Sequence, residues 1–499
     1  MTHTAPDGYL GTDARITSGP APELVEAGYE LETRDAPLLH RGLTLADLAH
    51  VTALVECGAV PAGRVAPLLC RLLELLDVPA ADFPYDPRYG DAYNSREREL
   101  QRTLGDSAGW LHLGRTRREA GRIAFRLALR GRLLDLHEAV SALAGALAAA
   151  EQRHAATLWA DSTYLQPAQP STFGHYLGGF AEQATRHLRR IGAAYATADV
   201  CPGGAGGAGG TRLPLDRDRI AELLGFAAPG RHTRDAMWST DVLVDAATAA
   251  VQSVLTVDQL AEDLEIFASP AFGYVTLDAS LCRASVLMPQ KRNPYALAVI
   301  RGGAGTLVGR LTGLLASGRT PSARTDNWLY AYGEVDGTLG LATRLVRLGA
   351  AVVAGLRPDA AELGRRARAH QVWAADLAEE IAVRLGVDYR TAYRVVGRAV
   401  AGSGQGAGTV TAEVLRSAAV AVTGAPLDVP ASVLAVAEDA AALVDARRAP
   451  GAAGPARVRD HAEAVTASVA GQDLWRRARR HRAADAEARL VATAGALVR

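Results

Sequence analysis

The chain of 499 residues lacks the features that would place it outside the cytoplasm. Its four cysteines are scattered and include no C-x-x-C pair, which favours buried free thiols in a reducing compartment over disulfides. The first twenty residues have no basic start followed by an apolar run, so no signal peptide is predicted. No uncharged apolar stretch of about 18 residues is found, so no membrane span is predicted. We therefore expect a cytoplasmic protein.

Charge of one sign is also lacking. Lysine plus arginine and aspartate plus glutamate each total 54, so the formal net charge is zero. A balanced chain has no basic footprint for nucleic acid or for an anionic membrane surface. We expect neither as a partner.

An alternating β pattern of any length is absent as well, and the chain is predicted to be all-α. Apolar residues recur at helical spacing from Leu43 to Leu76, with Pro61 dividing that run into two helices. Thr44 and Asp47 stand at the spacing of a helix N-cap and its reciprocal acid. Long helices are predicted over residues 123–154, 241–269 and 296–317. The second has apolar residues all round, which is typical of a helix buried inside a bundle.

Five glycines interrupt the helix predicted over residues 296–317. Each costs helix stability, so we expect them to mark close approach of another helix. A second glycine-rich segment, residues 201–210, lacks the strand and the lysine of a nucleotide-binding loop. We interpret it as a bend or a close-packed turn.

Two polar segments lie next to predicted helices. Residues 111–118 form a cationic strip in which Arg117 and Thr116 could clamp a carboxylate, because a guanidinium matches two oxygens. Solvated surface arginines are the alternative. Residues 163–175 place hydroxyls and amides at a proline-bounded helix entrance, where unpaired N–H groups favour anions. For His175 a hydrogen-bonded structural role is favoured over catalysis.

Residues 285–294 read Ser-Val-Leu-Met-Pro-Gln-Lys-Arg-Asn-Pro, and the two prolines predict a loop between helical flanks. Such a segment suits proton removal beside a carboxylate. Ser285 could take the proton, while Lys291 and Asn293 stabilise the developing charge. A surface loop with incidental polar residues is the alternative that composition alone leaves open.

The order of residues 288–294 resembles the signature loop of the fumarase/aspartase superfamily, and its Gln-Lys form resembles the argininosuccinate lyase branch. Residues 112–118 resemble that family's His-Thr-Gly-Arg-Ser-Arg-Asn strip, and residues 166–175 its Gln-x-Ala-Gln-Pro-x-Thr-Phe-Gly-His run. The resemblance covers most of residues 40–480. It implies three helical domains, with the long helices of four subunits forming a twenty-helix bundle. It also implies active sites assembled from three chains of a homotetramer.

The same resemblance assigns roles. Ser285 is expected to be the general base, Lys291 and Asn293 to stabilise the aci-carboxylate, Thr116 and Arg117 to bind the succinyl carboxylates, and Thr163 and Gln166 to complete the pocket. The aci-carboxylate carries two negative charges, and one well-placed donor lowers the barrier by roughly 2.7–4 kcal/mol. Several donors on its oxygens are therefore needed. The sequence shows no metal-ligand cluster, and this chemistry needs neither a metal nor an organic cofactor.

The chain departs from the family pattern at four positions. Tyr164 and Tyr93 stand where the family has histidines, Val286 replaces a second loop serine, and Arg118 replaces an asparagine. Loss of a general acid costs roughly 10²–10⁴ in rate when the leaving group needs a proton. Three outcomes are open. Tyr164 takes over as the general acid, the substrate has a better leaving group that needs no proton, or catalysis is lost. A positive charge at Arg118 favours a more acidic substrate or leaving group.

We therefore predict domains at residues 1–110, 111–357 and 358–499, with the long bundle helices in the second. The first functional hypothesis is a carbon–nitrogen lyase that releases fumarate from argininosuccinate or a related N-substituted aspartate. A specialised relative that acts on another substituted succinate is included. The second hypothesis is a structural or binding homologue without turnover.

Overall fold

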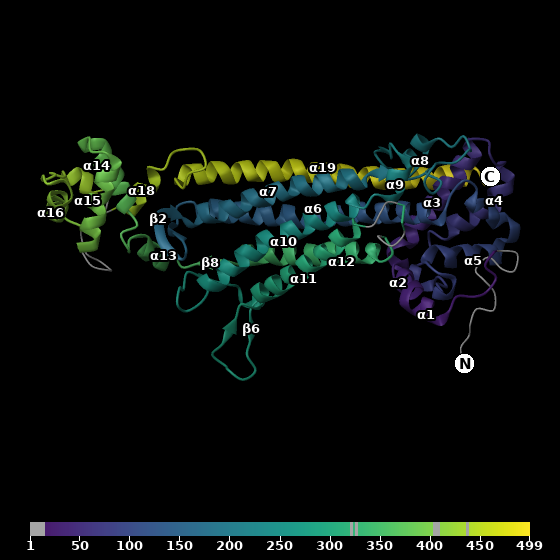
Figure 1. Ribbon diagram of the computed structural model, residues 1–499, viewed down its shortest axis with the longest axis horizontal. Helices are drawn as coiled ribbons and strands as arrows, with labels where there is room; N and C mark the ends of the chain where they lie inside the picture. The colour runs from purple at the N-terminus through teal and green to yellow at the C-terminus, as the bar shows by residue number, and fades with distance from the viewer. Residues whose placement is uncertain (1–14, 320–322, 325–327, 403–409, 436–438) are drawn as a thin grey trace.

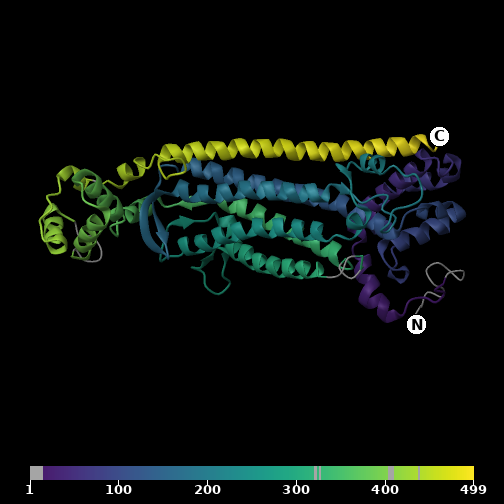
Figure 2. The same cartoon turned by 45° about the horizontal axis from the view of Figure 1, so that its top comes forward.

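The computed structural model describes residues 15–319, 323–324, 328–402, 410–435 and 439–499. It is elongated, with long helices running along its main axis and smaller groups of helices at both ends (Figure 1). The N-terminal helices and the C-terminus lie at the same end (Figures 1 and 2). The all-α prediction is confirmed apart from short strand pairs.

Six long helices make up the body of the molecule. They are α6 (Arg117–Arg153), α7 (Phe173–Ala198), α10 (Asp241–Phe267), α11 (Tyr295–Ser317), α12 (Ala331–Ala354) and α19 (Pro455–Ala496). Helix α6 packs against α7, α12, α19 and α3, so it is covered on most sides. The three long helices predicted from the sequence correspond to α6, α10 and α11.

Shorter elements complete the chain. The helices are α1 (Pro22–Leu24), α2 (Glu30–Thr33), α3 (Ala36–Glu56), α4 (Ala62–Glu74), α5 (Ala92–Leu104), α8 (Arg217–Leu223), α9 (Thr233–Trp238), α13 (Ala360–Ala367), α14 (Ala374–Leu385), α15 (Tyr389–Gly402), α16 (Ala412–Thr423), α17 (Ala431–Leu434) and α18 (Ala440–Asp445). The strand pairs are β1 (Leu158–Thr163) with β2 (Gln166–Thr172), β3 (Val200–Cys201) with β4 (Ala228–Pro229), β5 (Val275–Thr276) with β8 (Arg357–Pro358), and β6 (Arg283–Ala284) with β7 (Arg292–Asn293).

Two helices, α6 and α12, are long and apolar enough by composition to cross a membrane. Both are built into the bundle, and α6 carries buried arginines at positions 122, 126 and 130. A membrane-spanning segment with three charged side chains is costly, whereas a core helix of a large protein can pair them. Their composition is that of core helices.

The last helix, α19, runs the length of the bundle and returns to the N-terminal end (Figure 2). Its Val465, Leu490 and Ala494 belong to the same apolar core as α3 and α6. A second, smaller core is formed by α14 to α17 between Leu377 and Val433. The domain boundaries stay a prediction.

Helix α3 begins at Ala36, so Thr44 and Asp47 lie in its middle and the predicted capping pair is wrong. The Thr44 hydroxyl donates to the carbonyl of His40. The Asp47 carboxylate is fully buried and forms ion pairs with two guanidinium groups. One is that of Arg115, and the other is that of Arg96, whose Nη2 lies 3.4 Å from Asp47 Oδ2. The cap-like spacing of Thr44 and Asp47 is coincidental, and the Asp47 carboxylate instead neutralises two buried guanidinium groups.

The segment predicted as a helix entrance is instead an antiparallel hairpin, β1–β2, and α7 begins at Phe173. The Thr172 hydroxyl accepts from the backbone N–H of His175 and caps that helix. Tyr164 and Leu165 form the turn with φ of 54° and 58°. Two adjacent left-handed residues match a type I′ hairpin turn, which glycine or asparagine normally fills, so this turn is strained.

Within the described chain, the predicted close approach of another helix is found at one of the five glycines of α11 and is untested at the other four. Only Gly303 meets a neighbour closely, the side chain of Leu345. Gly302, Gly305, Gly309 and Gly313 face open space. Val299, Val308 and Leu315 are also exposed on this helix. The face of α11 is therefore apolar, small and uncovered in the single chain.

We expect Asp47→Ala to lower the free energy of unfolding by about 3–5 kcal/mol, because it leaves two buried arginines without a carboxylate. Urea unfolding followed by circular dichroism would measure the change. Glu74→Ala, which removes the exposed partner of Arg71, is the control and should cost about 0–1 kcal/mol. Equal effects of the two substitutions would contradict the assigned role of Asp47.

Candidate functional site

The cationic strip lies at the N-terminus of α6. Thr116 is the extended residue immediately before the helix, and Arg117 is its first residue. The unpaired N–H groups and the helix dipole favour an anion at this end. Gly114, two residues earlier, has a φ of 75°, and a Cβ there would lie 2.8 Å from Leu213. The turn therefore requires glycine and fixes the approach to the helix.

Arg115 anchors this strip to the protein core. Its buried guanidinium donates to the Asp47 carboxylate, to the carbonyl of Ala46 at 2.9 Å, and to the Tyr93 hydroxyl at 3.0 Å. Burial raises the pKa of the Tyr93 phenol above its usual value. Tyr93, at a position where the family has a histidine, is therefore held as a neutral acceptor and is poorly placed to release a proton.

A second anchor comes from the glycine-rich segment 201–210. The buried Glu119 carboxylate accepts from the N–H groups of Gly204 at 2.7 Å and Gly206 at 2.6 Å. Gly204, Gly206, Gly207 and Gly210 all have positive φ, which confirms the predicted close-packed turn. Sequence reasoning missed Glu119. An acid in the first turn of a helix after the strip was the available signal.

The two partly buried arginines of the strip, Arg117 and Arg118, are already paired. The Arg117 guanidinium lies 3.2 Å from Asp91, and that of Arg118 lies 2.9 Å from Glu32 and 3.8 Å from Asp91. The positive charge that the sequence assigned to Arg118 is therefore cancelled, and it gives no reason to expect a more acidic leaving group. Glu32 and Asp91 were missed because the fold, and no local pattern, brings them to the strip.

A small cavity opens beside the strip, between α2, α3, α5, α6 and α12. Its volume of about 20 Å³ has room for about one water molecule. It is lined by the polar side chains Glu32, Asp35, Asp91, Tyr93, Arg117, Arg118 and Tyr332, together with apolar residues. Three carboxyl groups against two guanidinium groups make this the acidic side of the strip.

Thr163, Tyr164 and Gln166 lie at the tip of the β1–β2 hairpin, at the other end of α6. All three are exposed, and Tyr164 is 99% exposed. With 37 residues, α6 separates this tip from Arg117 by about 55 Å, at ~1.5 Å per residue. His175 at the hairpin base contacts Ser171 and the carbonyl of Gly451, which confirms its hydrogen-bonded role.

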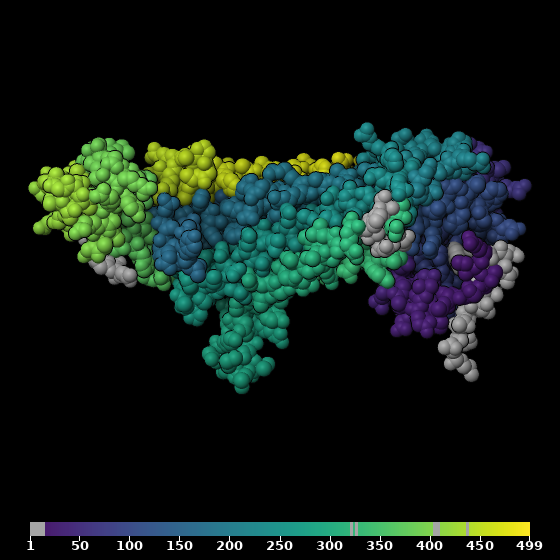
Figure 3. Space-filling view, in the orientation of Figure 1, coloured from purple at the N-terminus to yellow at the C-terminus, as the bar shows by residue number. Residues whose placement is uncertain are grey.

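The Ser285 loop projects from the body between β6 and β7 (Figures 1 and 3). The Ser285 Oγ accepts from the backbone N–H groups of Leu287 at 3.3 Å and Met288 at 3.1 Å. Two N–H donors stabilise negative charge on an oxygen, as a hydroxyl acting as a base requires. The Asn293 side chain donates to the carbonyl of Arg283 across the strand pair at 3.0 Å. Val286, Leu287 and Met288 expose apolar side chains at the tip.

Lys291 is the only lysine among the 54 lysine and arginine residues of the chain. The other residues of this set are all arginine. A compact ammonium with three donors differs from a planar guanidinium in size and in direction of hydrogen bonding. The chain thus places its one ammonium group, exposed, on this loop.

The structure thus leaves the three predicted segments apart within one chain. The strip lies at one end of α6, the hairpin tip at the other, and the Ser285 loop below the bundle (Figures 1 and 3). Thr116, Arg117 and Arg118 lie together, as do Ser285, Lys291 and Asn293, and as do Thr163, Tyr164 and Gln166. A site that uses all three groups needs more than one copy of the chain.

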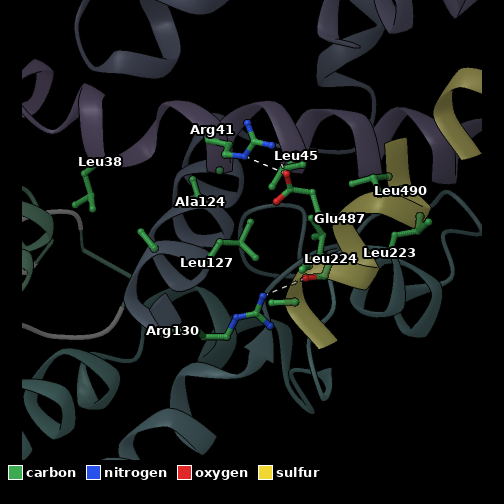
Figure 4. Close-up of a pocket in the computed structure, with 14 residues that line it drawn as sticks. Leu38, Arg41, Leu45, Ala124, Leu127, Arg130, Leu223, Leu224, Glu487 and Leu490 are labelled. Atoms are coloured by element: carbon green, nitrogen blue, oxygen red, sulfur yellow. Dashed lines mark hydrogen bonds and ion pairs between the residues drawn. The ribbon is translucent and has the colours of Figure 1, made fainter. Parts of the chain in front are cut away.

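A larger cavity, of about 380 Å³, lies between α3, α6, α8 and α19 (Figure 4). Its walls are mainly leucine and alanine, Arg41 and Glu487 pair at its edge, and Arg130 donates to the carbonyl of Leu224 at 3.2 Å. None of the predicted site residues lines it. We do not place the reaction there.

Comparison with known proteins gives consistent results. A family model described as a lyase matches residues 43–309. Argininosuccinate lyase 1 of Mesorhizobium japonicum is 31% identical over 398 residues, 78% of this chain and 83% of that protein. The argininosuccinate lyase of Methanoculleus marisnigri is 30% identical, over 71% of this chain and 73% of that protein.

Solved structures agree with these sequences. An EDDS lyase variant with bound fumarate has a TM-score of 0.85 at 26% identity, over 96% of each chain. EDDS lyase in complex with formate has a TM-score of 0.85 at 27% identity, over 97% of each chain. The class II fumarase of Schistosoma mansoni, at 14% identity and a TM-score of 0.66 over 83% of this chain and 92% of its own, shares the fold.

We expect Glu32 and Arg118 to be coupled, because each mostly buried side chain neutralises the other. In a double-mutant cycle of Glu32→Gln and Arg118→Gln, the coupling free energy should be about 0.5–3 kcal/mol, measured by urea unfolding. The exposed pair Arg457–Asp460 is the control and should couple by less than about 0.5 kcal/mol. Additive effects at Glu32 and Arg118 would show that Arg118 keeps a free charge.

Proposed function

Because the chain belongs to the argininosuccinate lyase-like branch of the fumarase/aspartase superfamily, it is a carbon–nitrogen lyase, and we propose that it cleaves an N-substituted aspartate by β-elimination to fumarate and an amine or guanidine compound. The Ser285 loop carries this proposal. It places the serine hydroxyl, the sole lysine and Asn293 on one projecting segment. The localisation we propose is cytoplasmic, and the substrate a small molecule with a succinyl group.

The proposed reaction begins when Ser285 removes a proton from the carbon next to a carboxylate. The electrons move into that carboxylate, which becomes a doubly negative aci-carboxylate. Lys291 and Asn293 donate to its oxygens, and the ammonium supplies the compensating charge. Collapse of this intermediate forms the carbon–carbon double bond and breaks the carbon–nitrogen bond.

Thr116 and Arg117, at the positive end of α6, bind the other carboxylate of the succinyl group. Arg117 must then exchange Asp91 for the substrate, so the ion pair at 3.2 Å keeps the guanidinium oriented before binding. Thr163 and Gln166 complete the pocket from the hairpin. Arg118 is a binding residue whose charge is balanced by Glu32.

We propose that these three groups meet in a homotetramer. Each group is held apart from the others by the bundle, and each is partly or fully exposed. The uncovered face of α11, with glycines and small apolar residues, suits close packing of an identical helix. The apolar tip of the Ser285 loop also suits contact with another protomer.

We expect Ser285→Ala to abolish fumarate release and Lys291→Arg to lower kcat by about 10²–10³, the effect of one misplaced donor on a developing anion. Ultraviolet detection of fumarate across N-substituted aspartates, including argininosuccinate and EDDS, would measure both. Ser280→Ala, a nearby exposed serine, is the control and should keep full activity. Full activity of Ser285→Ala would dismiss the assigned base, and no fumarate from the unmodified protein on any substrate would favour a binding homologue.

We expect inactive Ser285→Ala and Arg117→Gln chains to regain activity when co-expressed. A mixed tetramer contains sites in which Ser285 comes from an Arg117→Gln chain and Arg117 from a Ser285→Ala chain, whereas a tetramer of either variant alone has no site with both residues. Differently tagged chains, purified in tandem, would show that mixed tetramers form. If such tetramers form and stay inactive, the two residues come from the same chain and the shared-site proposal is wrong.

A further inference from the structure

We propose that Asp35 is the general acid that protonates the leaving nitrogen, and this assignment rests on the lyase reaction proposed above. The carboxyl group lies between α2 and α3 and lines the small cavity beside Arg117.

Asp35 is fixed where α12 approaches the strip. The backbone of Gly333 lies against its carboxyl group and opposes the rise in the Asp35 pKa. A Cβ at position 333 would lie 2.5 Å from the Asp35 Oδ1, so only glycine allows this approach. The carboxyl group is partly buried and shares the cavity with Arg117 and Tyr332. The position is therefore built by the backbone and is held against the site.

Of the three carboxyl groups in the cavity, Asp35 differs from the others in its partners. Asp91 is held by Arg117, and Glu32 by Arg118. A guanidinium partner favours the charged form of a carboxyl group, which disfavours its use as a proton donor. In the part of the chain that the structure describes, no lysine, arginine or histidine forms an ion pair with Asp35. Asp35 is thus the carboxyl group free to carry a proton.

The surroundings favour the protonated form. Burial, opposed by the Gly333 backbone and reinforced by the negative charges of Asp336, Glu32 and Glu334, raises the pKa of Asp35 to about 7. A general acid works best when its pKa lies near the working pH, because it is then both protonated and able to release the proton.

The two tyrosines are less suited to this role. The Tyr93 hydroxyl is buried, accepts from Arg115 and faces a raised pKa. Tyr164 lies on the hairpin tip at the opposite end of α6 and can reach the strip only from another protomer. Asp35 does not have to come from another protomer, because it lines the same cavity as Arg117 of its own chain.

The proton balance closes without a further reactant. Ser285 gains the proton from carbon, and the electron pair of that bond becomes the carbon–carbon double bond. The nitrogen leaves with the electron pair of the broken carbon–nitrogen bond and receives the Asp35 proton, directly or through one water molecule. Asp35 is left ionised and Ser285 protonated, and exchange of one proton with solvent resets both.

The test compares leaving groups in Asp35→Asn, which preserves the shape of the side chain. With N-aryl aspartates, whose weakly basic nitrogen is unprotonated at neutral pH and needs a proton to leave, kcat should fall by about 10²–10⁴. With N-alkyl aspartates, whose nitrogen already carries that proton as an ammonium group, the loss should be much smaller. Circular dichroism and the oligomeric mass check that the variant folds.

The pH profile gives an independent measurement. Because Asp35 must be protonated, kcat/KM of the unmodified enzyme should be level below about pH 7 and should fall above it, by tenfold per pH unit. Asp35→Asn should lack this alkaline limb. Asp336→Asn removes a negative charge near Asp35, so it should move the limb to lower pH while keeping the dependence on the leaving group.

Equal losses on alkyl and aryl substrates in Asp35→Asn would show a structural or binding role and overturn the assignment. An unchanged alkaline limb in that variant, or in Asp336→Asn if Asp35→Asn does not fold, would also overturn it. These outcomes leave the lyase reaction standing, because they require an active unmodified enzyme. An unmodified enzyme that releases no fumarate from any substrate refutes the proposed function itself, and the Asp35 assignment with it.

Discussion

The rigidity of helix α6 is the constraint on which the arrangement of the site depends. One helix carries the cationic strip at its first residues and leads into the hairpin with Thr163 and Gln166 at its end. Packing on most sides keeps the helix straight, so the two groups cannot approach each other within a chain. A chain built in this way is suited to a site completed by neighbours, in which each copy gives different residues to different sites.

Electrostatic balance at the strip follows from the same packing. Arg115, Arg117 and Arg118 are each opposed by a carboxylate, from Asp47, Asp91 and Glu32. The paired guanidinium groups are held in place before any substrate binds, which lowers the cost of ordering them on binding. Asp35 stands outside this pairing, and its carboxyl group therefore responds to burial and to like charges instead of to a cation.

The departures from the family pattern become connected in three dimensions. Arg118, which replaces an asparagine, is compensated by Glu32, so the pair adds no net charge to the site. Tyr93, which replaces a histidine, is absorbed into the network of Arg115 and Asp47. Tyr93 held in this way offers no ready proton at the strip, and the Asp35 proposed above supplies an acid in the same cavity.

The sequence by itself determined the helical class, the long helices and the chemistry of the loop. Helical periodicity and the two prolines around Lys291 are local properties, and local patterns are preserved whatever the chain packs against. Sequence reasoning failed where the tertiary environment decides the local structure. The capping interpretation of Asp47 and the helix entrance at residues 163–175 were plausible locally, but α3 begins earlier and the second segment pairs with β1 as a hairpin.

Only the tertiary structure decided which charges are free. Glu32, Asp91 and Arg118 are distant in the sequence, and no spacing rule links them, so the neutralisation of Arg118 required the fold. The separation of Ser285 from Arg117 and Thr163 is likewise a property of the packed bundle. Ionisation depends on burial and on neighbouring charges, both of which are set by distances in space. The candidate groups of the site could therefore be named from the sequence, and their ion-pair partners and placement could not.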